Sequence, residues 1–297
     1  MKKVLIIGSS NIDMTLRTLR FPERGETIFS SSFDTNLGGK GLNQAVAASI
    51  TGADVTFLTA LGNDNYKDYI LKELKKYNLN VIPIIKRCST GVAFINVEEE
   101  TSENKIIVNS GANAHLNKKD IDKYIYLIEE TDYILLQLEV NLDTIKYIIK
   151  KAKEYGKIVI LNPAPYLPLD DFILKNVDYL TPNRTELNLL VRNIFQSYID
   201  ESDYLIRCGV KNVIVTLGED GAYFVNETND MHIKAYKTNA IDTTGAGDCF
   251  NGVFVGLLSL GYEFKEALDY ASYAASISVS RPGASKSYPN FDEIKND

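Results

Sequence analysis

Residues 241–252 read "IDTTGAGDCFNG", and the segment that follows, up to Leu260, is almost wholly apolar. An apolar run that ends at a glycine, here Gly261, predicts a helix with a glycine C-cap. We expect this helix to begin at Gly247 or Asp248, directly after a group of small residues. The first amides of a helix lack intrahelical partners and its dipole is positive there, so the stretch predicts a cradle for an anion.

Asp248 allows two interpretations. It could be a helix N-cap, which would only stabilise the helix. It could instead be a general base that takes a proton from an attacking hydroxyl beside a bound phosphate. Gly245, Ala246 and Gly247 favour the second interpretation, because small residues let a phosphate approach the backbone closely.

Outside this stretch, short apolar runs alternate with segments of helical spacing. The runs suit strands buried on both faces and cover residues 4–8, 55–62, 133–139, 157–162, 178–183 and 212–218. The segments with helical spacing are 43–50, 65–77, 117–130, 141–155 and 184–195. This alternation predicts an α/β protein with a mostly parallel sheet flanked by helices, and without linkers or repeats we expect one domain over residues 1–297.

Two regions break the alternation. Residues 14–37 and 91–109 have strands with alternating or polar faces joined by polar turns. They predict a small antiparallel sheet that projects from the main domain as a β lid. The alternative is that they form edge strands of the main sheet.

Composition narrows the class of protein. The chain has 297 residues, of which 45% are hydrophobic and 24% charged, as in ordinary globular proteins. A net charge of −7 argues against a nucleic-acid partner, whose phosphates require a basic surface. The three cysteines are far apart and odd in number, so they indicate neither a disulfide framework nor a zinc site. No apolar run has the length of a membrane span or a signal peptide, so we expect no membrane partner and a cytoplasmic location.

The segment 36–49, "NLGGKGLNQAVAAS", is a second candidate site. It is not a phosphate-binding P-loop, because Lys40 is followed by Gly41 and not by Ser or Thr. It could be a glycine-rich turn before a helix. It could also place Lys40 and Asn43 against a small polyol, with glycines that admit the ligand to the backbone.

A third candidate, "GSSNID" at residues 8–13, follows the first predicted strand. Its single glycine is not the G-x-G-x-x-G motif of dinucleotide sites, which disfavours a nicotinamide-dependent enzyme. Asn11 and Asp13 are two apart, so in extended chain they point the same way. Two such acceptors suit a vicinal diol.

In combination, these segments resemble the ribokinase family of small-molecule kinases, also called the PfkB carbohydrate kinases. Matching pieces run in order along almost the whole chain: "GSSNID", "GGKGLNQAVAA", "STGVAFINV", "NSGANAHL", "LLQLEV", "LNPAP", "TPNRTEL", "VTLGEDGA", "DTTGAGDCFNG" and "RPGAS". The resemblance implies a doubly wound sheet with a β lid that forms a homodimer.

The resemblance also implies an activity, ATP-dependent phosphorylation of D-ribose at O5 to D-ribose 5-phosphate. Within the family, deoxyribose, another pentose, fructose or a nucleoside are alternative acceptors. A sugar-binding sensor without catalysis is an alternative of another class, which the intact GAGD sequence with Asp248 disfavours.

Matching positions imply site residues. Asp248 is the base, and Gly245, Ala246 and Gly247 form the anion hole. The sugar residues are Asn11, Ile12, Asp13, Gly39, Lys40, Gly41, Asn43 and Glu139. ATP is expected at Asn183, Thr216, Leu217, Gly218, Glu219, Asp220, Gly221, Gly247 and Ser272, although a larger polar residue often occupies the Ser272 position.

The resemblance implies two metal ions as well. Magnesium is expected near Glu186, through water, and potassium beside the anion hole. The potassium residues are Asp242, Thr244, Ser278, Arg281, Gly283 and Ser287, mostly through carbonyl groups. A cation on the far side of the loop would fix the loop and add positive potential near the transferred phosphate.

Overall fold

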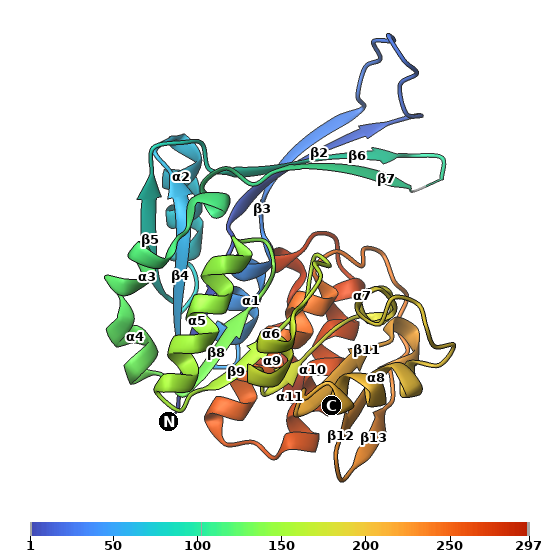
Figure 1. Ribbon diagram of the computed structural model, residues 1–297. Helices are drawn as coiled ribbons and strands as arrows, with labels where there is room; N and C mark the ends of the chain where they lie inside the picture. Colours follow the sequence, from blue (N-terminus) through green and yellow to red (C-terminus); the bar gives the residue numbers. More distant parts are fainter. Residues whose placement is uncertain (1, 102, 296–297) are drawn as a thin grey trace.

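The structure, a computed structural model that describes residues 2–101 and 103–295, contains two sheets (Figure 1). The larger sheet has nine strands, in the order β13 (Asp230–Ile233), β12 (Ala222–Asn226), β11 (Asn212–Thr216), β10 (Tyr179–Leu180), β9 (Ile158–Leu161), β8 (Tyr133–Leu136), β1 (Lys3–Gly8), β4 (Asp54–Gly62) and β5 (Asn80–Lys86). Neighbours from β11 to β5 are parallel, while β12 and β13 are antiparallel at one edge. The expected mostly parallel sheet is therefore confirmed.

The larger sheet buries both of its faces, and β1 shows how. Val4 and Ile6 pack into one hydrophobic core, while Leu5 and Ile7 pack into the core on the other face. A strand with two buried faces is apolar at every position, which explains the continuous apolar run in the sequence. The six strands expected from such runs are all present, with bounds shifted by a few residues.

Helices cover each face. The core that contains Val4 and Ile6 receives side chains from α1 (Lys40–Ser49), α2 (Asn65–Leu74), α9 (Ala246–Leu260), α10 (Phe264–Val279) and α11 (Phe291–Lys295). The other core receives side chains from α3 (Lys118–Asp122), α4 (Ile125–Glu130), α5 (Leu142–Glu154), α6 (Asp171–Asn176), α7 (Arg184–Leu190) and α8 (Tyr198–Arg207). No helix in residues 2–101 and 103–295 is both long and apolar enough to span a membrane.

Two predicted helices differ from the structure. The segment 117–130 forms two short helices, α3 and α4, instead of one. The helix predicted over 184–195 ends at Leu190, because Arg192 and Asn193 have positive φ angles of 58° and 53°. A left-handed backbone cannot continue a right-handed helix.

The smaller sheet projects from the main body (Figure 1) and has the strand order β3 (Ser32–Gly38), β2 (Asn11–Thr18), β6 (Gly91–Glu98) and β7 (Asn104–Asn109). It is antiparallel within the pairs β2–β3 and β6–β7, while its central pair β2–β6 is parallel. These four strands form a sheet of their own, so the alternative that they are edge strands of the larger sheet is wrong. The lid predicted over 14–37 and 91–109 overlaps these strands, and its closure stays a prediction.

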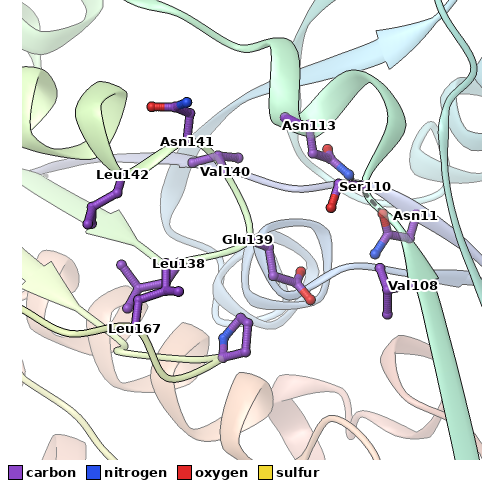
Figure 2. Close-up of a pocket in the computed structure, with 12 residues that line it drawn as sticks. Asn11, Val108, Ser110, Asn113, Leu138, Glu139, Val140, Asn141, Leu142 and Leu167 are labelled. Atoms are coloured by element: carbon purple, nitrogen blue, oxygen red, sulfur yellow. Dashed lines mark hydrogen bonds between the residues drawn. The ribbon is translucent and has the colours of Figure 1, made fainter.

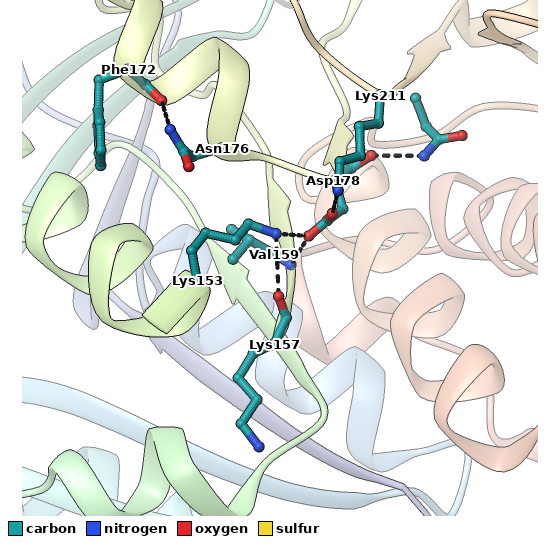
Figure 3. A network of polar contacts seen from close by, with 8 residues as sticks. Lys153, Lys157, Val159, Phe172, Asn176, Asp178 and Lys211 are labelled. Atoms are coloured by element: carbon teal, nitrogen blue, oxygen red, sulfur yellow. Dashed lines mark hydrogen bonds and ion pairs between the residues drawn. The ribbon is translucent and has the colours of Figure 1, made fainter. Parts of the chain in front are cut away.

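A polar cluster ties several strands together where they begin (Figure 3). Asp178, just before β10, accepts hydrogen bonds from the Val159 amide at 2.8 Å and pairs with Lys153 and Lys211. Burial favours a raised pKa for Asp178, but the two lysines and this amide outweigh it and hold the pKa below its usual value. The cluster stabilises the end of the sheet where these strands begin, whereas the predicted site residues follow the opposite strand ends.

Candidate active site

Asp248 lies in the first turn of α9. The helix begins at Ala246, with Gly245 as its N-cap at φ 76°, so it starts one or two residues earlier than expected. The Asp248 side chain is buried, at 6% exposure, and makes no capping hydrogen bond. The N-cap interpretation of Asp248 is therefore wrong.

The Asp248 carboxylate is held by two amide side chains from α1. Asn43 donates to Oδ2 at 3.2 Å, and Gln44 donates to Oδ1 at 2.9 Å. Gln44 is itself fixed, because its Nε2 also donates to Asn162 and its Oε1 accepts from Gln137. Sequence reasoning missed Gln44, although it stands next to Asn43 in the glycine-rich segment.

The loop before α9 leaves room for a ligand at Gly247. A Cβ added at Gly247 would meet no atom within 4 Å, whereas one at Gly245 would lie 2.9 Å from the Tyr288 hydroxyl. Tyr288 donates to the Gly245 carbonyl at 3.0 Å and so holds the loop from behind. The Ala246 amide donates to Thr243 at 3.3 Å, a long hydrogen bond. The backbone at Gly247 therefore faces open space at the positive end of a helix.

Lys40 and Glu139 meet at the start of α1. Gly39 is the N-cap of α1 with a φ of 90°, and the Lys40 amide donates to Glu139 Oε2 at 2.8 Å. Ser9 donates to the same oxygen at 2.5 Å. The negative charge of Asp248 raises the pKa of the Lys40 ammonium more than burial lowers it, and Glu139 and Glu186 raise it further. Lys40 is therefore a cation shared among three carboxylates.

A cavity of about 430 Å³ opens beside Glu139 (Figure 2). Two predicted sugar residues, Asn11 and Glu139, line it together with Asn113, Ser110 and apolar side chains from the segment after β8. Asn11 Oδ1 accepts a hydrogen bond from Asn113 at 2.8 Å. The structure thus joins the end of β1 to Glu139, which lies almost 130 residues away.

Asp13 and Ile12 have different surroundings. Burial, with smaller contributions from the charges of Glu139 and Asp248, raises the pKa of Asp13 to about 7. A Cβ added at Gly38 would lie 2.0 Å from the Asp13 carboxylate, so glycine is needed there. The Ile12 side chain is in the hydrophobic core, and only its backbone could reach a sugar.

Most of the predicted nucleotide residues come from two neighbouring segments, whereas Gly247 lies in α9 and Ser272 in α10. Asn183 and Thr216 form a parallel bridge, and Gly218–Asp220 is a short 3₁₀ helix after β11. Asn183 and Glu186 form a capping box at the start of α7. Burial is the main cause that raises the pKa of Glu186, followed by the charge of Asp248. Ser272 lies buried on α10.

The residues predicted to hold potassium lie in the loop before α9 and in a second segment that runs from Ser278, at the end of α10, to Ser287, and Asp242 joins the two. Its carboxylate accepts from the Thr244 amide and the Gly283 amide, each at 2.9 Å. Burial alone would raise the pKa of Asp242, but these hydrogen bonds hold it below its usual value. The Arg281 guanidinium pairs with Glu293, so Arg281 could contribute only its backbone oxygen, whereas the Ser287 hydroxyl donates to the Ala284 carbonyl and keeps oxygen lone pairs for a cation.

The ligand atoms at the two expected cation sites can be compared with those that magnesium and potassium prefer. In residues 2–101 and 103–295, no three His, Cys, Asp or Glu side chains form a metal-binding group. Carbonyl oxygens with one carboxylate nevertheless fit potassium, which takes hard oxygen ligands. Glu186 alone fits a magnesium ion that keeps most of its water and binds mainly to phosphates.

Comparison with known proteins agrees with this geometry. A model of the pfkB family of carbohydrate kinases matches residues 1–290. The ribokinase of Staphylococcus aureus (strain COL) is 39% identical, over 98% of both chains, and the deoxyribokinase of Salmonella typhi is 36% identical, over 98% of this chain and 97% of its own. The crystal structure of ribokinase from Thermotoga maritima has a TM-score of 0.92 at 38% identity, covering 99% of this chain and 98% of its own. This chain is thus a member of the pfkB family of carbohydrate kinases.

Proposed function

We propose that this protein transfers the γ-phosphoryl group of ATP to O5 of D-ribose, giving D-ribose 5-phosphate and ADP. The observation that carries the proposal is the pair of helix starts at Gly39 and Gly245. Asp248 in α9 accepts hydrogen bonds from Asn43 and Gln44 in α1. A carboxylate is therefore held between a polyol pocket and an open glycine loop.

The sugar is held by polar groups from three segments. Asn11 and Asp13 come from β2, Lys40 and Asn43 from α1, and Glu139 follows β8. Ser9 and the Lys40 amide occupy Glu139 Oε2, so Oε1 is available to a sugar hydroxyl. A small, fully hydroxylated sugar satisfies such a set of donors and acceptors.

Asp248 takes the proton of the O5 hydroxyl as O5 attacks the γ-phosphorus. The bond between this phosphorus and the β–γ bridging oxygen breaks, and ADP leaves with the bonding electrons. The backbone amides of residues 245–247 and the Lys40 ammonium stabilise the charge on the transferred group.

Two cations complete the proposal. Glu186 would hold magnesium through water, and the ion would supply positive charge that neutralises the phosphates of ATP. The carbonyl groups of Asp242, Thr244, Ser278, Arg281 and Gly283, with Ser287, would hold potassium. By holding this cation, these residues would keep the loop before α9 in one conformation.

Water has to be excluded during transfer, since it would otherwise hydrolyse ATP. We propose that the smaller sheet closes over the sugar as a lid. The same sheet is the proposed interface of a homodimer. A cytoplasmic location fits the supply of ATP and the three free cysteines.

A kinase for 2-deoxy-D-ribose is the second candidate. It is favoured by the similarity to the deoxyribokinase of Salmonella typhi, which is only slightly lower than that to the ribokinase of Staphylococcus aureus. The two candidates share the roles of Asp248 and Lys40 and differ only in the sugar.

A coupled ADP-release assay with ATP, magnesium and potassium tests the proposal. D-ribose, 2-deoxy-D-ribose, fructose, adenosine and a reaction without acceptor are compared. We expect a rate with D-ribose far above the others. A higher rate with another acceptor would replace the substrate and keep the Asp248 chemistry.

Asp248→Asn is the matched variant for this assay. It keeps the size of the side chain and removes the base, so we expect turnover to fall roughly 100-fold or more with sugar binding nearly intact. Near-normal turnover would contradict the assignment of the base. Sugar binding without any turnover in the unaltered protein would indicate a sensor.

A further inference from the structure

Asn113 is a buried side chain that contacts the proposed sugar site and has no role in the mechanism above. It lies in the short 3₁₀ helix Gly111–His115, within the "NSGANAHL" segment, and is 1% exposed. Figure 2 shows it beside Asn11 at the wall of the cavity.

The orientation of the Asn113 amide is set by the backbone of Ser10. The Ser10 amide donates to Asn113 Oδ1 at 3.0 Å, and the Ser10 carbonyl accepts from Asn113 Nδ2 at 3.2 Å. Rotating the amide by 180° would bring two donors together and two acceptors together. Because Ser10 is fully buried, water could not relieve either contact.

Asn113 in turn sets the orientation of Asn11. The second hydrogen on Asn113 Nδ2 is donated to Asn11 Oδ1 at 2.8 Å. The oxygen of Asn11 is thereby turned toward Asn113, and its nitrogen points into the cavity (Figure 2). Within the described part of the chain, Asn11 Nδ2 has no hydrogen-bond partner.

Gly91 leaves space for this pair. It lies beside Asn11 in the β2–β6 register, and an added Cβ would be 2.1 Å from Asn11 Oδ1 and 2.5 Å from Asn113 Nδ2. Three segments, around Ser10–Asn11, Gly91 and Asn113, therefore meet at one contact. Such a contact holds a side chain in a single orientation.

We propose that Asn113 is a positioning residue that determines sugar selectivity by making Asn11 a hydrogen-bond donor to the substrate. This inference rests on the proposed function and deepens it. A sugar hydroxyl oxygen accepts the hydrogen bond from Asn11 Nδ2. A sugar that lacks this hydroxyl leaves the donor unpaired, which the site penalises.

The test compares D-ribose with its 2-deoxy and 3-deoxy analogues in the unaltered protein and in Asn113→Ala. The analogue whose kcat/KM is changed least by Asn11→Ala lacks the hydroxyl that Asn11 contacts. We expect Asn113→Ala to lower kcat/KM for D-ribose about 10-fold and to change that of this analogue less than about 2-fold. In an Asn11→Ala background, Asn113→Ala should leave the ratio of kcat/KM for D-ribose to kcat/KM for this analogue unchanged.

Asn212→Ala is the control for a general loss of stability. Asn212 is a half-buried amide that donates to the Asp178 carbonyl at 2.8 Å, at the opposite end of the sheet. This variant should not change the sugar ratio. An equal loss with all three sugars in Asn113→Ala would overturn the proposal.

Calorimetric titration of the same sugars without ATP separates this inference from the proposed function. Binding that favours D-ribose and loses this preference in Asn113→Ala supports the inference even without turnover. Absence of ADP release with every pentose would overturn the proposed function. Equal binding of all three sugars by the unaltered protein would overturn the inference.

Discussion

At the scale of single residues, the site places several acidic groups near one cation. Asp13, Glu139, Glu186 and Asp248 carry negative charge within reach of one another, and Lys40 is the cation among them. Burial is the main cause that raises the pKa of Asp13 and of Glu186, because it favours the neutral form of these two acids. Asp13 shows the largest consequence, a pKa of about 7.

This pKa predicts that sugar binding depends on pH. Ionised Asp13 accepts two hydrogen bonds from a diol, so binding should favour the deprotonated form. With a pKa of about 7, the ionised fraction rises about 10-fold between pH 6 and pH 8, and ribose affinity should rise by up to this factor. Calorimetry in two buffers with different ionisation enthalpies should detect release of a proton on binding at pH 6.

Folding stability should change in the opposite direction. The pKa of Asp13 is raised from 3.8 to about 7 in the folded state, so the folded protein binds more protons in this range. The contribution of Asp13 to the free energy of unfolding is fully present below pH 3.8 and is lost as pH rises through 7.

Asp13→Asn tests the prediction on sugar binding. It should abolish the pH dependence of sugar affinity, whereas an unchanged dependence would mean that another group titrates.

At the scale of elements, the site is built from two helix starts that lie side by side, because α1 and α9 pack against each other along their length. Both α1 and α9 have a glycine N-cap with positive φ, and neither has a side-chain cap. Instead, Glu139 and Ser9 occupy amides at the start of α1. Two positive helix ends close to one another suit an anionic transition state.

The loop before α9 predicts activation by potassium. A cation bound by the residue 242–244 and 278–287 segments would hold the Gly245–Gly247 backbone in place. Replacing sodium with potassium should raise kcat about 3-fold or more, with little change in the ribose KM. Potassium should also raise the melting temperature, and the rise should increase with the logarithm of the potassium concentration once this exceeds the dissociation constant.

Asp242→Asn is the variant that tests this loop. It should weaken the effects of potassium on kcat and on the melting temperature. The two oxygens of Asp242 accept hydrogen bonds from the backbone amides of Thr244 and Gly283, and in Asp242→Asn a side-chain NH2 group would face one of these amides. Asp54→Asn, at an exposed acid at the start of β4, should respond as the unaltered protein does. A flat response to potassium in the unaltered protein would count against the cation site.

At the scale of the whole molecule, the smaller sheet has an exposed apolar face. Phe94 lies between Met14 and Ile107 in the strand register, and Phe33 lies opposite Leu16. Phe33, Phe94 and Ile107 are 57%, 50% and 72% exposed. Asp13 and Val108 alternate with these residues and so point to the other face, which contacts the sugar cavity.

An apolar face of this kind predicts self-association through the smaller sheet. Ile107→Lys would place a charge at the centre of the contact and should weaken the dimer at least about 10-fold. Analytical ultracentrifugation over a range of protein concentrations measures the change. Ile199→Lys, at an exposed apolar residue of α8, is the control and should leave association unchanged. A monomeric unaltered protein would contradict the proposed interface.

Local patterns in the sequence suffice to predict most of this fold. The apolar runs of β1 and β8 predict buried strands because each face of a parallel sheet meets a helix layer. The small residues 245–247 indicate a helix start, although α9 begins one or two residues earlier than expected. The ends of elements are less predictable: Arg192 and Asn193 adopt positive φ, which asparagine tolerates but which no preference of arginine indicates.

The sequence by itself determined the fold class and, through its resemblance to a family, the set of candidate residues. Only the tertiary structure decided which atoms of those residues face a ligand. The sequence suggests that Asn11 and Asp13 both accept hydrogen bonds from the sugar. In the structure, Asn113 donates to the Asn11 oxygen, and the Asn11 nitrogen faces the cavity as a donor. Gln44 was overlooked although it holds Asp248. Such choices depend on hydrogen bonds between segments about 100 to 200 residues apart, and local sequence carries no record of these contacts.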